Sequence, residues 1–291
     1  MRANTSARSS VAGYGVIVTG GASGLGLAYA EALAEHGARV TLIDVDGDAV
    51  AAQASRLRGE GLDVRGAVAD VTDRAALDRV IDEAAAAYGR LDVAFANAGI
   101  DPGPGFIRFP GGGGQARAAD GALERYDDER WNRVIEINLN GIFATARAAT
   151  RHMRPRRSGR IIITTSVAAT VVQTVIGSAY LAAKAGARHF MHSIALELAA
   201  DGITANAIAP GVFATSIGGG RTLDAGVQAA LASVIPMRRV GQPDDIKALA
   251  LFLASPASDY ITGQEIVIDG GMTLGVVDDG LTTTQGGYRH G

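Results

Sequence analysis

Short β-branched, apolar runs alternate with alanine-rich stretches of helical character along most of the chain. The apolar runs predict strands at Tyr14–Thr19, Arg39–Asp44, Asp63–Val68, Leu91–Ala96, Arg160–Thr165, Thr204–Ile208 and Glu265–Asp269. Helices are predicted between them, including Leu25–His36, Asp73–Tyr88, Asp128–His152, Ala179–Ala200 and Pro243–Ala254. Nearly continuous apolar strands are typical of a parallel sheet that is covered on both faces. The pattern therefore predicts an α/β fold: a single Rossmann-type domain with a doubly wound parallel sheet of about seven strands.

Two long segments interrupt this alternation, Asp101–Arg125 with its four glycines Gly111–Gly114, and Val212–Val240 with Gly218–Gly220. Both are predicted as loops that leave the carboxyl ends of strands, where ligands bind in open α/β sheets. We expect them to wall a substrate site, although the four-glycine stretch is equally consistent with a floppy surface insertion. The expected domain spans residues 13–274, between a flexible N-terminal tail at 1–12 and a C-terminal tail at 275–291.

Composition narrows the function classes. The chain has 291 residues, 47% of them hydrophobic, a formal net charge of −3 and no cysteine. This balance argues against a nucleic-acid or anionic-membrane partner. The polar start is not a signal peptide, and no apolar run is long enough to cross a bilayer, so we expect a cytoplasmic protein with a small-molecule substrate.

A glycine-rich turn follows the first predicted strand. Gly20 permits a tight turn, while Gly24 and Gly26 let the backbone approach a pyrophosphate at the start of the next helix. Asp44 ends the second strand, where a carboxylate accepts hydrogen bonds from the adenosine ribose and repels a 2′-phosphate. Since the glycine turn carries no lysine or arginine, the sequence predicts NAD(H) rather than NADP(H) as cofactor.

The candidate chemistry lies on the helix that begins near residue 179. Tyr180 and Lys184 are four residues apart and share a helix face, so the ammonium lowers the pKa of the phenol. Tyr180 is then a general base toward an alcohol, or a general acid toward a carbonyl. Ser166 follows the fifth strand and is placed to hydrogen-bond the reacting oxygen, with the neighbouring Thr165 as the alternative.

Two other groups of polar residues are weaker candidates. His189 and His192 lie three apart on this same helix, but no third ligand accompanies them, so no metal site is predicted. An anionic substrate group could be bound by one of three arginines in the interrupting segments, although solvated side chains are the ordinary expectation there. These are Arg108, Arg117 and Arg221.

These motifs, in this order and at these intervals, resemble the classical short-chain dehydrogenases/reductases over residues 13–274. The resemblance rests on the turn Thr19–Gly26, Asp70-Val71, Asn97-Ala98-Gly99, Asn138, Ser166, Tyr180 with Lys184, Asn206, Pro210-Gly211, Thr215 and the final Asp269-Gly270-Gly271. Departures from the family pattern are a Ser166–Tyr180 interval one residue longer than usual, Ala96 in place of a second asparagine, and the long Asp101–Arg125 segment.

The resemblance implies a reversible NAD-dependent dehydrogenase of a secondary alcohol, with Asn138 in a proton relay and Lys184 also holding the nicotinamide ribose. It implies a homotetramer or homodimer built around the helix of Tyr180 and Lys184. The cofactor-binding residues that it implies are Gly20, Ser23, Gly24, Leu25, Gly26, Asp44, Asp70, Val71, Asn97, Ala98, Gly99, Tyr180, Lys184, Pro210, Gly211, Val212 and Thr215. Two alternatives stay open: an NADPH-dependent reductase of ketones or 3-oxoacyl groups, and a dinucleotide-sensing protein without turnover.

Overall fold

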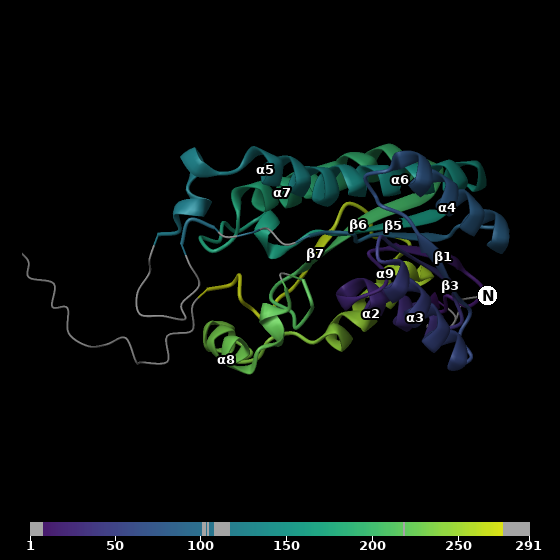
Figure 1. Cartoon of the computed structure of the whole chain (residues 1–291). Helices are drawn as coiled ribbons and strands as arrows, with labels where there is room; N and C mark the ends of the chain where they lie inside the picture. The colour runs from purple at the N-terminus through teal and green to yellow at the C-terminus, as the bar shows by residue number, and fades with distance from the viewer. Residues whose placement is uncertain (1–7, 101–102, 104, 108–116, 218, 276–291) are drawn as a thin grey trace, which may run out of the picture.

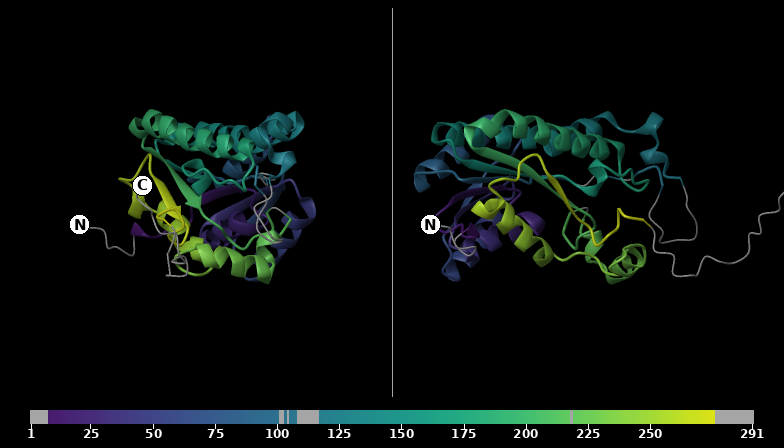
Figure 2. Two further views of the ribbon diagram at one scale, coloured as in Figure 1. Left: turned by 90° about the vertical axis from the view of Figure 1, so that its left-hand side faces the viewer. Right: turned by 180° about the vertical axis from the view of Figure 1, so that it is seen from behind.

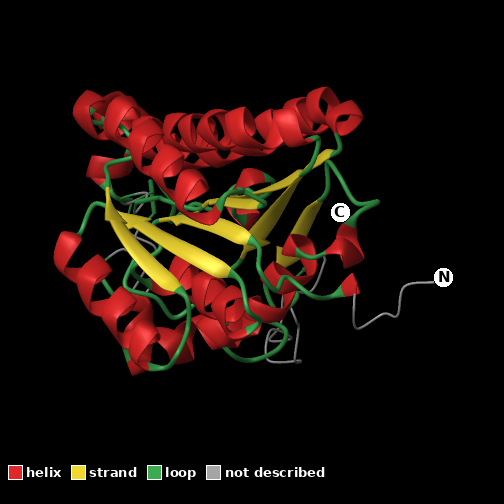
Figure 3. Ribbon diagram, turned by 90° about the vertical axis from the view of Figure 1, so that its right-hand side faces the viewer, coloured by secondary structure: helices red, strands yellow, loops and turns green. Residues whose placement is uncertain are grey.

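One parallel sheet forms the centre of the molecule (Figures 1 and 3). The computed structural model describes residues 8–100, 103, 105–107, 117–217 and 219–275. Within these residues the strand order is β3-β2-β1-β4-β5-β6-β7, and every pair is parallel. The predicted Rossmann-type fold is therefore confirmed. The strands are β1 (Gly15–Thr19), β2 (Arg39–Asp44), β3 (Val64–Val68), β4 (Val93–Ala96), β5 (Gly159–Thr164), β6 (Ile203–Pro210) and β7 (Glu265–Ile268).

Helices cover both faces of the sheet, as Figures 1 and 2 show. One hydrophobic core lies against α2 (Gly24–Glu35), α3 (Gly47–Gly59) and α9 (Lys247–Ala254). The other core lies against α4 (Arg74–Tyr88), α6 (Gly141–Met153) and α7 (Ser178–Leu198), with α5 (Asp128–Ile135) beside α7. In the part of the chain that the structure describes, no helix has the length and apolar character needed to cross a membrane.

The position of a strand in the sheet decides how deeply it is buried. All residues of β1, β4 and β5 are buried, as continuous apolar runs predict for central strands. The edge strands β3 and β7 are partly exposed, because each has a neighbour on one side only. The strand order reverses between β1 and β4, so the segments that leave these two strands diverge and open a crevice at their carboxyl ends.

The predicted helix Asp128–His152 is helical throughout, but it is not a regular α-helix over its whole length. A π-helical turn, Glu136–Asn140, separates α5 from α6. Inside it the Asn138 Nδ2 donates a 3.2 Å hydrogen bond to the carbonyl oxygen of Val134, four residues earlier. A side chain that takes up a main-chain carbonyl disturbs the regular ladder, and single π-turns occur frequently at functional sites.

The prediction of Val212–Val240 as a loop was wrong for its middle part, residues 221–234. There the chain forms the short 3₁₀ turn Arg221–Leu223 and the helix α8 (Ala225–Val234). The side chain of Asp224 accepts a 2.9 Å hydrogen bond from the Val227 N–H and so caps α8. The preceding glycines obscured this Asp-capped, alanine-rich helix in the sequence.

The other interrupting segment is partly described. Gly105 N donates to the carbonyl of Val175 and Ile107 N to that of Thr174, which brings this segment against the chain that precedes α7. Short 3₁₀ turns follow at Ala119–Gly121 and Leu123–Arg125. The glycines Gly111–Gly114, Arg108, residues 1–7 of the expected N-terminal tail and residues 276–291 of the C-terminal tail lie outside the described residues. The rest of the N-terminal tail is described, and its Val11 is fully buried in the core.

Candidate active site

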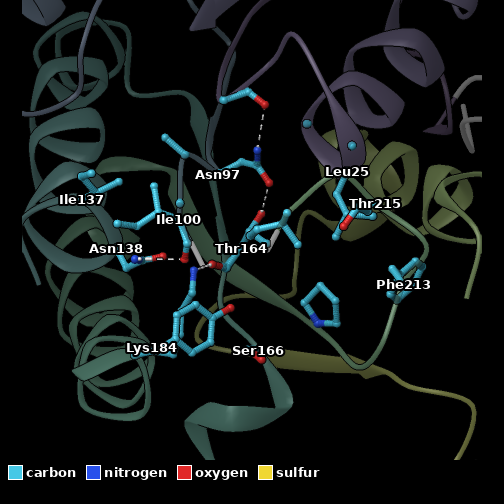
Figure 4. Close-up of a pocket in the computed structure, with 18 of the residues that line it drawn as sticks. Leu25, Asn97, Ile100, Ile137, Asn138, Thr164, Ser166, Lys184, Phe213 and Thr215 are labelled. Carbon is cyan, nitrogen blue, oxygen red and sulfur yellow. Dashed lines mark hydrogen bonds between the residues drawn. The ribbon is translucent and has the colours of Figure 1, made fainter. Parts of the chain in front are cut away.

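A pocket of about 540 Å³ opens at the carboxyl ends of the strands. Its wall comes from the turns after β1, β2, β3, β4, β5 and β6 together with α5, the π-turn and α7. Every residue that the sequence assigned to catalysis or to the cofactor lines this one pocket, although these positions span residues 20 to 215. Figure 4 shows part of this wall around Asn97, Asn138 and Lys184.

The glycine turn after β1 forms a cradle of bare backbone. Gly20 and Gly24 have φ angles of +63° and +53°, which favour glycine. A Cβ on Gly26 would lie 2.0 Å from the carbonyl oxygen of Gly20, so no side chain fits there. The Ser23 side chain makes no capping hydrogen bond to α2. Backbone N–H groups at the start of this helix suit the pyrophosphate of a dinucleotide, so the cradle fits such a cofactor.

Asn97 holds the glycine turn against the end of β5. Its Nδ2 donates to the carbonyl oxygens of Thr19, at 3.0 Å, and Gly20, at 3.2 Å. Its Oδ1 accepts a 3.0 Å hydrogen bond from the Thr164 hydroxyl. The amide therefore links the cofactor side of the pocket to the strand that leads to Ser166, as the dashed lines in Figure 4 trace.

Asp44 ends β2 at the pocket wall. One carboxylate oxygen accepts a 3.1 Å hydrogen bond from the Ala22 N–H in the glycine turn. The other accepts from the N–H groups of Val45, at 2.8 Å, and Asp46, at 3.3 Å. These bonds fix the carboxylate beside the turn. Among the described residues that line the pocket the basic ones are Arg133, Lys184 and Arg221, so the part of the wall beside Asp44, formed by the glycine turn and the segment after β2, carries none.

Lys184 is a buried lysine whose side chain is directed toward the pocket (Figure 4). Its Nζ donates a 2.8 Å hydrogen bond to the carbonyl oxygen of Thr164 and lies 5.5 Å from the centre of the Tyr180 ring. Burial lowers the pKa of Lys184 from 10.5 to about 8, because the low dielectric disfavours the ammonium. The site thus places a readily titrated cation beside the tyrosine.

The two adjacent hydroxyls after β5 have different surroundings. The Thr165 hydroxyl is buried and lies 2.7 Å from Glu265 Oε1 and 3.1 Å from the Ile208 carbonyl oxygen. The Ser166 side chain is partly exposed and accepts a 3.1 Å hydrogen bond from the Ala168 N–H. Since that bond uses only one lone pair, the Ser166 hydroxyl keeps its proton for another acceptor. The geometry therefore favours Ser166 over Thr165 as the oxygen ligand.

Asn138 is fully buried in the π-turn. Its Nδ2 donates to the carbonyl oxygen of Val134, and a longer contact of 3.5 Å reaches that of Ile100. Its Oδ1 has no hydrogen-bond partner among the described residues. A buried, unpaired amide oxygen is costly, and an ordered water next to the pocket would satisfy it.

A family model matches almost the entire chain. The model described as enoyl-(acyl carrier protein) reductase covers residues 20–273, from the glycine turn to the segment after β7. The chain belongs to the short-chain dehydrogenase/reductase family. It is therefore an oxidoreductase that acts on hydroxyl or keto groups with a nicotinamide dinucleotide.

Characterised members of the family support this assignment over nearly full length. The chain is 39% identical to cis-4-hydroxycyclohexanecarboxylate dehydrogenase of Sinomonas cyclohexanicum over 259 residues, 88% of this chain and 95% of the relative. It is 35% identical to the 3-oxoacyl-[acyl-carrier-protein] reductase FabG of Escherichia coli, over 89% of this chain and 96% of the relative. Among solved structures, the chain resembles a gluconate 5-dehydrogenase from Burkholderia cenocepacia, crystallised in complex with NADP and tartrate. The two sequences are 34% identical, the TM-score is 0.82, and the match covers 94% of this chain and 100% of the other.

Several pocket residues of this family member were not found from the sequence. Four of them, Phe213, Ser216, Ile217 and Thr222, lie in a segment that the sequence could assign only as a substrate wall. Ile100 follows the Asn97–Gly99 motif directly and Thr164 lies two residues before Ser166, so proximity to a motif was the available signal for these two. The others are Ile43, Val45, Ala69, Arg133, Ile137, Val167, Ala168, Gln173 and Ile176.

Proposed function

We propose that this enzyme is an NAD-dependent dehydrogenase that oxidises a secondary alcohol to a ketone, reversibly. The observation that carries the proposal is the meeting of Ser166, Tyr180 and the buried Lys184 in one pocket with the glycine cradle. The bound nicotinamide supplies the hydride chemistry, while the protein supplies position, polarity and proton transfer.

Each of these side chains has a separate task in the proposed reaction. The Tyr180 oxygen takes the hydroxyl proton of the substrate during oxidation and returns it during reduction. The Lys184 ammonium, held by Thr164, favours the phenolate and binds the nicotinamide ribose. Ser166 donates to the substrate oxygen, and the water that Asn138 Oδ1 accepts from passes the proton onward.

Asp44 supports NAD over NADP. The fixed carboxylate would accept hydrogen bonds from ribose hydroxyls and would repel a 2′-phosphate, for which the described residues of the glycine turn and of the segment after β2 offer no cation. The Burkholderia gluconate 5-dehydrogenase was crystallised with NADP, so the preference has to be tested on this chain.

Replacing Asp44 with alanine is expected to weaken NADH binding by about tenfold and to narrow the gap between NADH and NADPH, because a charged hydrogen-bond acceptor contributes about 1.5–3 kcal/mol. Fluorescence titration of both cofactors measures this. Asp48→Ala removes an exposed carboxylate of α3 outside the pocket wall and serves as the charge-matched control. Unchanged NADH affinity in Asp44→Ala would refute the proposed role.

Hydroxy acids are the substrate class that we propose. The Sinomonas relative is named for a hydroxy carboxylate, and the Burkholderia structure is named for gluconate and holds tartrate. In this chain Arg221 lines the pocket on the segment that also contributes Phe213 and Ile217, so a guanidinium accompanies an apolar wall. Arginine matches a carboxylate in both charge and geometry.

Arg221→Ala is then expected to raise KM for a hydroxy acid by about tenfold or more, since a charge-assisted hydrogen bond contributes about 1.5–3 kcal/mol. KM for a neutral alcohol of similar size should change little. Steady-state kinetics with both substrates measures the difference in KM. Arg133→Ala also removes an arginine from the pocket wall and controls for the loss of a positive charge there. If KM for NAD⁺ rises instead, Arg221 serves the pyrophosphate and the substrate assignment is wrong.

A second candidate is a 3-oxoacyl reductase that uses NADPH. The 35% identity with FabG and the description of the family model favour it. Asp44 opposes it, because this carboxylate disfavours the 2′-phosphate. Higher kcat/KM with NADPH than with NADH on a 3-oxoacyl thioester would establish this alternative.

A further inference from the structure

A buried carboxylate lies behind the catalytic wall, outside the pocket. Glu265 begins β7, and its side chain is only 7% exposed. Its Oε1 accepts a 2.7 Å hydrogen bond from the Thr165 hydroxyl, and its Oε2 accepts a longer one, 3.4 Å, from the Thr170 hydroxyl. The same Oε2 lies 2.8 Å from Arg188 Nε, an ion pair that does not have the geometry of a hydrogen bond. One carboxylate therefore contacts three side chains from two other parts of the fold.

The side chains that contact Glu265 lie near Ser166 in the chain and near Lys184 on the helix that also carries Tyr180. Thr165 and Thr170 are positions immediately before and four residues after Ser166, so the carboxylate holds the turn that presents the serine on both sides. Arg188 lies on α7, four residues and therefore one turn beyond Lys184. The Ser166 hydroxyl accepts a hydrogen bond from the Ala168 N–H in its own turn. The helix α7 is joined to this region directly, because Lys184 Nζ donates to the Thr164 carbonyl oxygen and α7 packs on the turn Val167–Ala169. Glu265 adds a second, side-chain connection between the serine turn and α7.

The chemistry of the cluster suits a rigid connection. A carboxylate this far buried is stable only when it is paired and hydrogen-bonded, and hydrogen bonds to an ionised acceptor are the strong ones. Its partners therefore hold their positions. The serine and the tyrosine must both reach the substrate oxygen, while a bound nicotinamide would face the carbon that carries it, and a displacement of about 1 Å at such a site costs about 10²-fold in rate.

We propose that Glu265, through Thr165 and Arg188, is a positioning residue that fixes Ser166 relative to Tyr180. The inference rests on the proposed function, since it presumes the roles of Ser166 and Tyr180. We call Glu265, Thr165 and Arg188 the clamp. None of these three residues needs to touch the substrate. The last strand of the sheet, which is partly exposed at the edge, then has a direct effect on the rate of the chemical step.

The test compares Thr165→Val, Glu265→Gln and their double variant with wild type. Thr165→Val preserves the shape of a side chain that is 1% exposed and removes the hydroxyl that reaches the carboxylate. We expect kcat to fall about 10–100-fold in each single variant, while KM for the alcohol and the Kd for NADH stay within about twofold. Thr165→Ser restores the hydroxyl and should recover kcat to within about threefold of wild type. The double variant should be little slower than either single one, because both changes break the same connection.

Asp92→Asn is the matched control. The Asp92 carboxylate is 2% exposed, pairs with Arg90 and Arg156, and accepts from the Gly15 N–H at the amino ends of the central strands β1 and β4. Its loss should lower the melting temperature without changing kcat in the surviving folded enzyme. The clamp would be overturned if kcat fell as far in Asp92→Asn as in Glu265→Gln, or if the losses of the two single variants added in the double variant. Glu265 would then have a purely structural role.

Failure of the clamp and failure of the proposed function give different results. If Tyr180→Phe abolishes turnover while Thr165→Val and Glu265→Gln retain wild-type kcat, the clamp alone is wrong. If Tyr180→Phe retains wild-type turnover, the proposed chemistry is wrong, and the clamp is overturned with it.

Discussion

Tyr180→Phe is expected to lower kcat by about 10²–10⁴-fold, the range that one positioned proton-transfer group contributes. The change removes a single oxygen. It keeps the aromatic ring, whose centre lies 5.5 Å from Lys184 Nζ, so packing around the lysine should persist. The Kd for NADH should accordingly stay near its wild-type value, and the loss should appear in kcat rather than in binding. Initial rates of NADH formation and a fluorescence titration of NADH measure the two quantities.

Tyr260→Phe provides the control for this change, because Tyr260 is fully exposed at 103%. It should match wild type in both measurements. If Tyr180→Phe turned over as fast as Tyr260→Phe, the tyrosine would not be the acid–base group. A protein that binds dinucleotide without chemistry would then be the better account.

Lys184→Met is expected to abolish most activity and yet to raise the stability of the folded protein. Burial lowers the pKa of Lys184 to about 8 in the folded state, against an ordinary value of 10.5. The folded state therefore holds this proton less tightly than the unfolded state does, and the ammonium costs stability. This difference in pKa corresponds to a loss of at most about 3 kcal/mol in the free energy of unfolding below pH 8. The lost hydrogen bond to Thr164 offsets part of the gain.

The pH dependence distinguishes this cause from general repacking. The cost of the ammonium is fully present below pH 8 and fades as the pH rises from about 8 to 10.5, because the wild-type lysine then becomes neutral. The stability advantage of Lys184→Met should fade over the same window. Chemical denaturation of the cofactor-free protein at several pH values measures it.

Lys247→Met is the matched control. Lys247 Nζ lies 2.9 Å from Glu31 Oε2 and 2.8 Å from Asp244 Oδ1, so this ammonium is paired and its loss should not stabilise the protein. A Lys184→Met variant that is less stable than wild type at pH 7 would mean that the buried ammonium is better compensated than its surroundings indicate.

The sequence predicted the sheet well, because buried strands need uninterrupted apolar runs and polar turns bound them. The observed β2 begins and ends where the pattern placed it. Helix α8 was missed because Asp224 and an alanine-rich run follow glycines that suggest a loop. The π-turn was missed because it depends on the direction of one side chain, that of Asn138, which no periodicity encodes.

The pocket residues that belong to the sequence motifs could be predicted, and most of the others could not. Glycines, Asn97 and the Tyr180–Lys184 pair are recognisable because backbone approach and helix spacing restrict the residue types. The sequence already favoured Ser166 over Thr165, and the structure adds a physical reason, because β5 ends before both residues and it is the Thr165 hydroxyl that meets Glu265. That contact joins residues one hundred positions apart, beyond the range of local patterns.

The most direct test of the account is the initial rate of NADH formation at 340 nm. Purified enzyme would be mixed with NAD⁺, and separately with NADP⁺, against matched panels of hydroxy carboxylic acids and neutral secondary alcohols, with Tyr180→Phe alongside. The account predicts turnover of a hydroxy acid with NAD⁺ that Tyr180→Phe loses. Turnover with NADP⁺ alone would contradict the role of Asp44. Equal rates in wild type and Tyr180→Phe would contradict the tyrosine-based chemistry at the centre of the account.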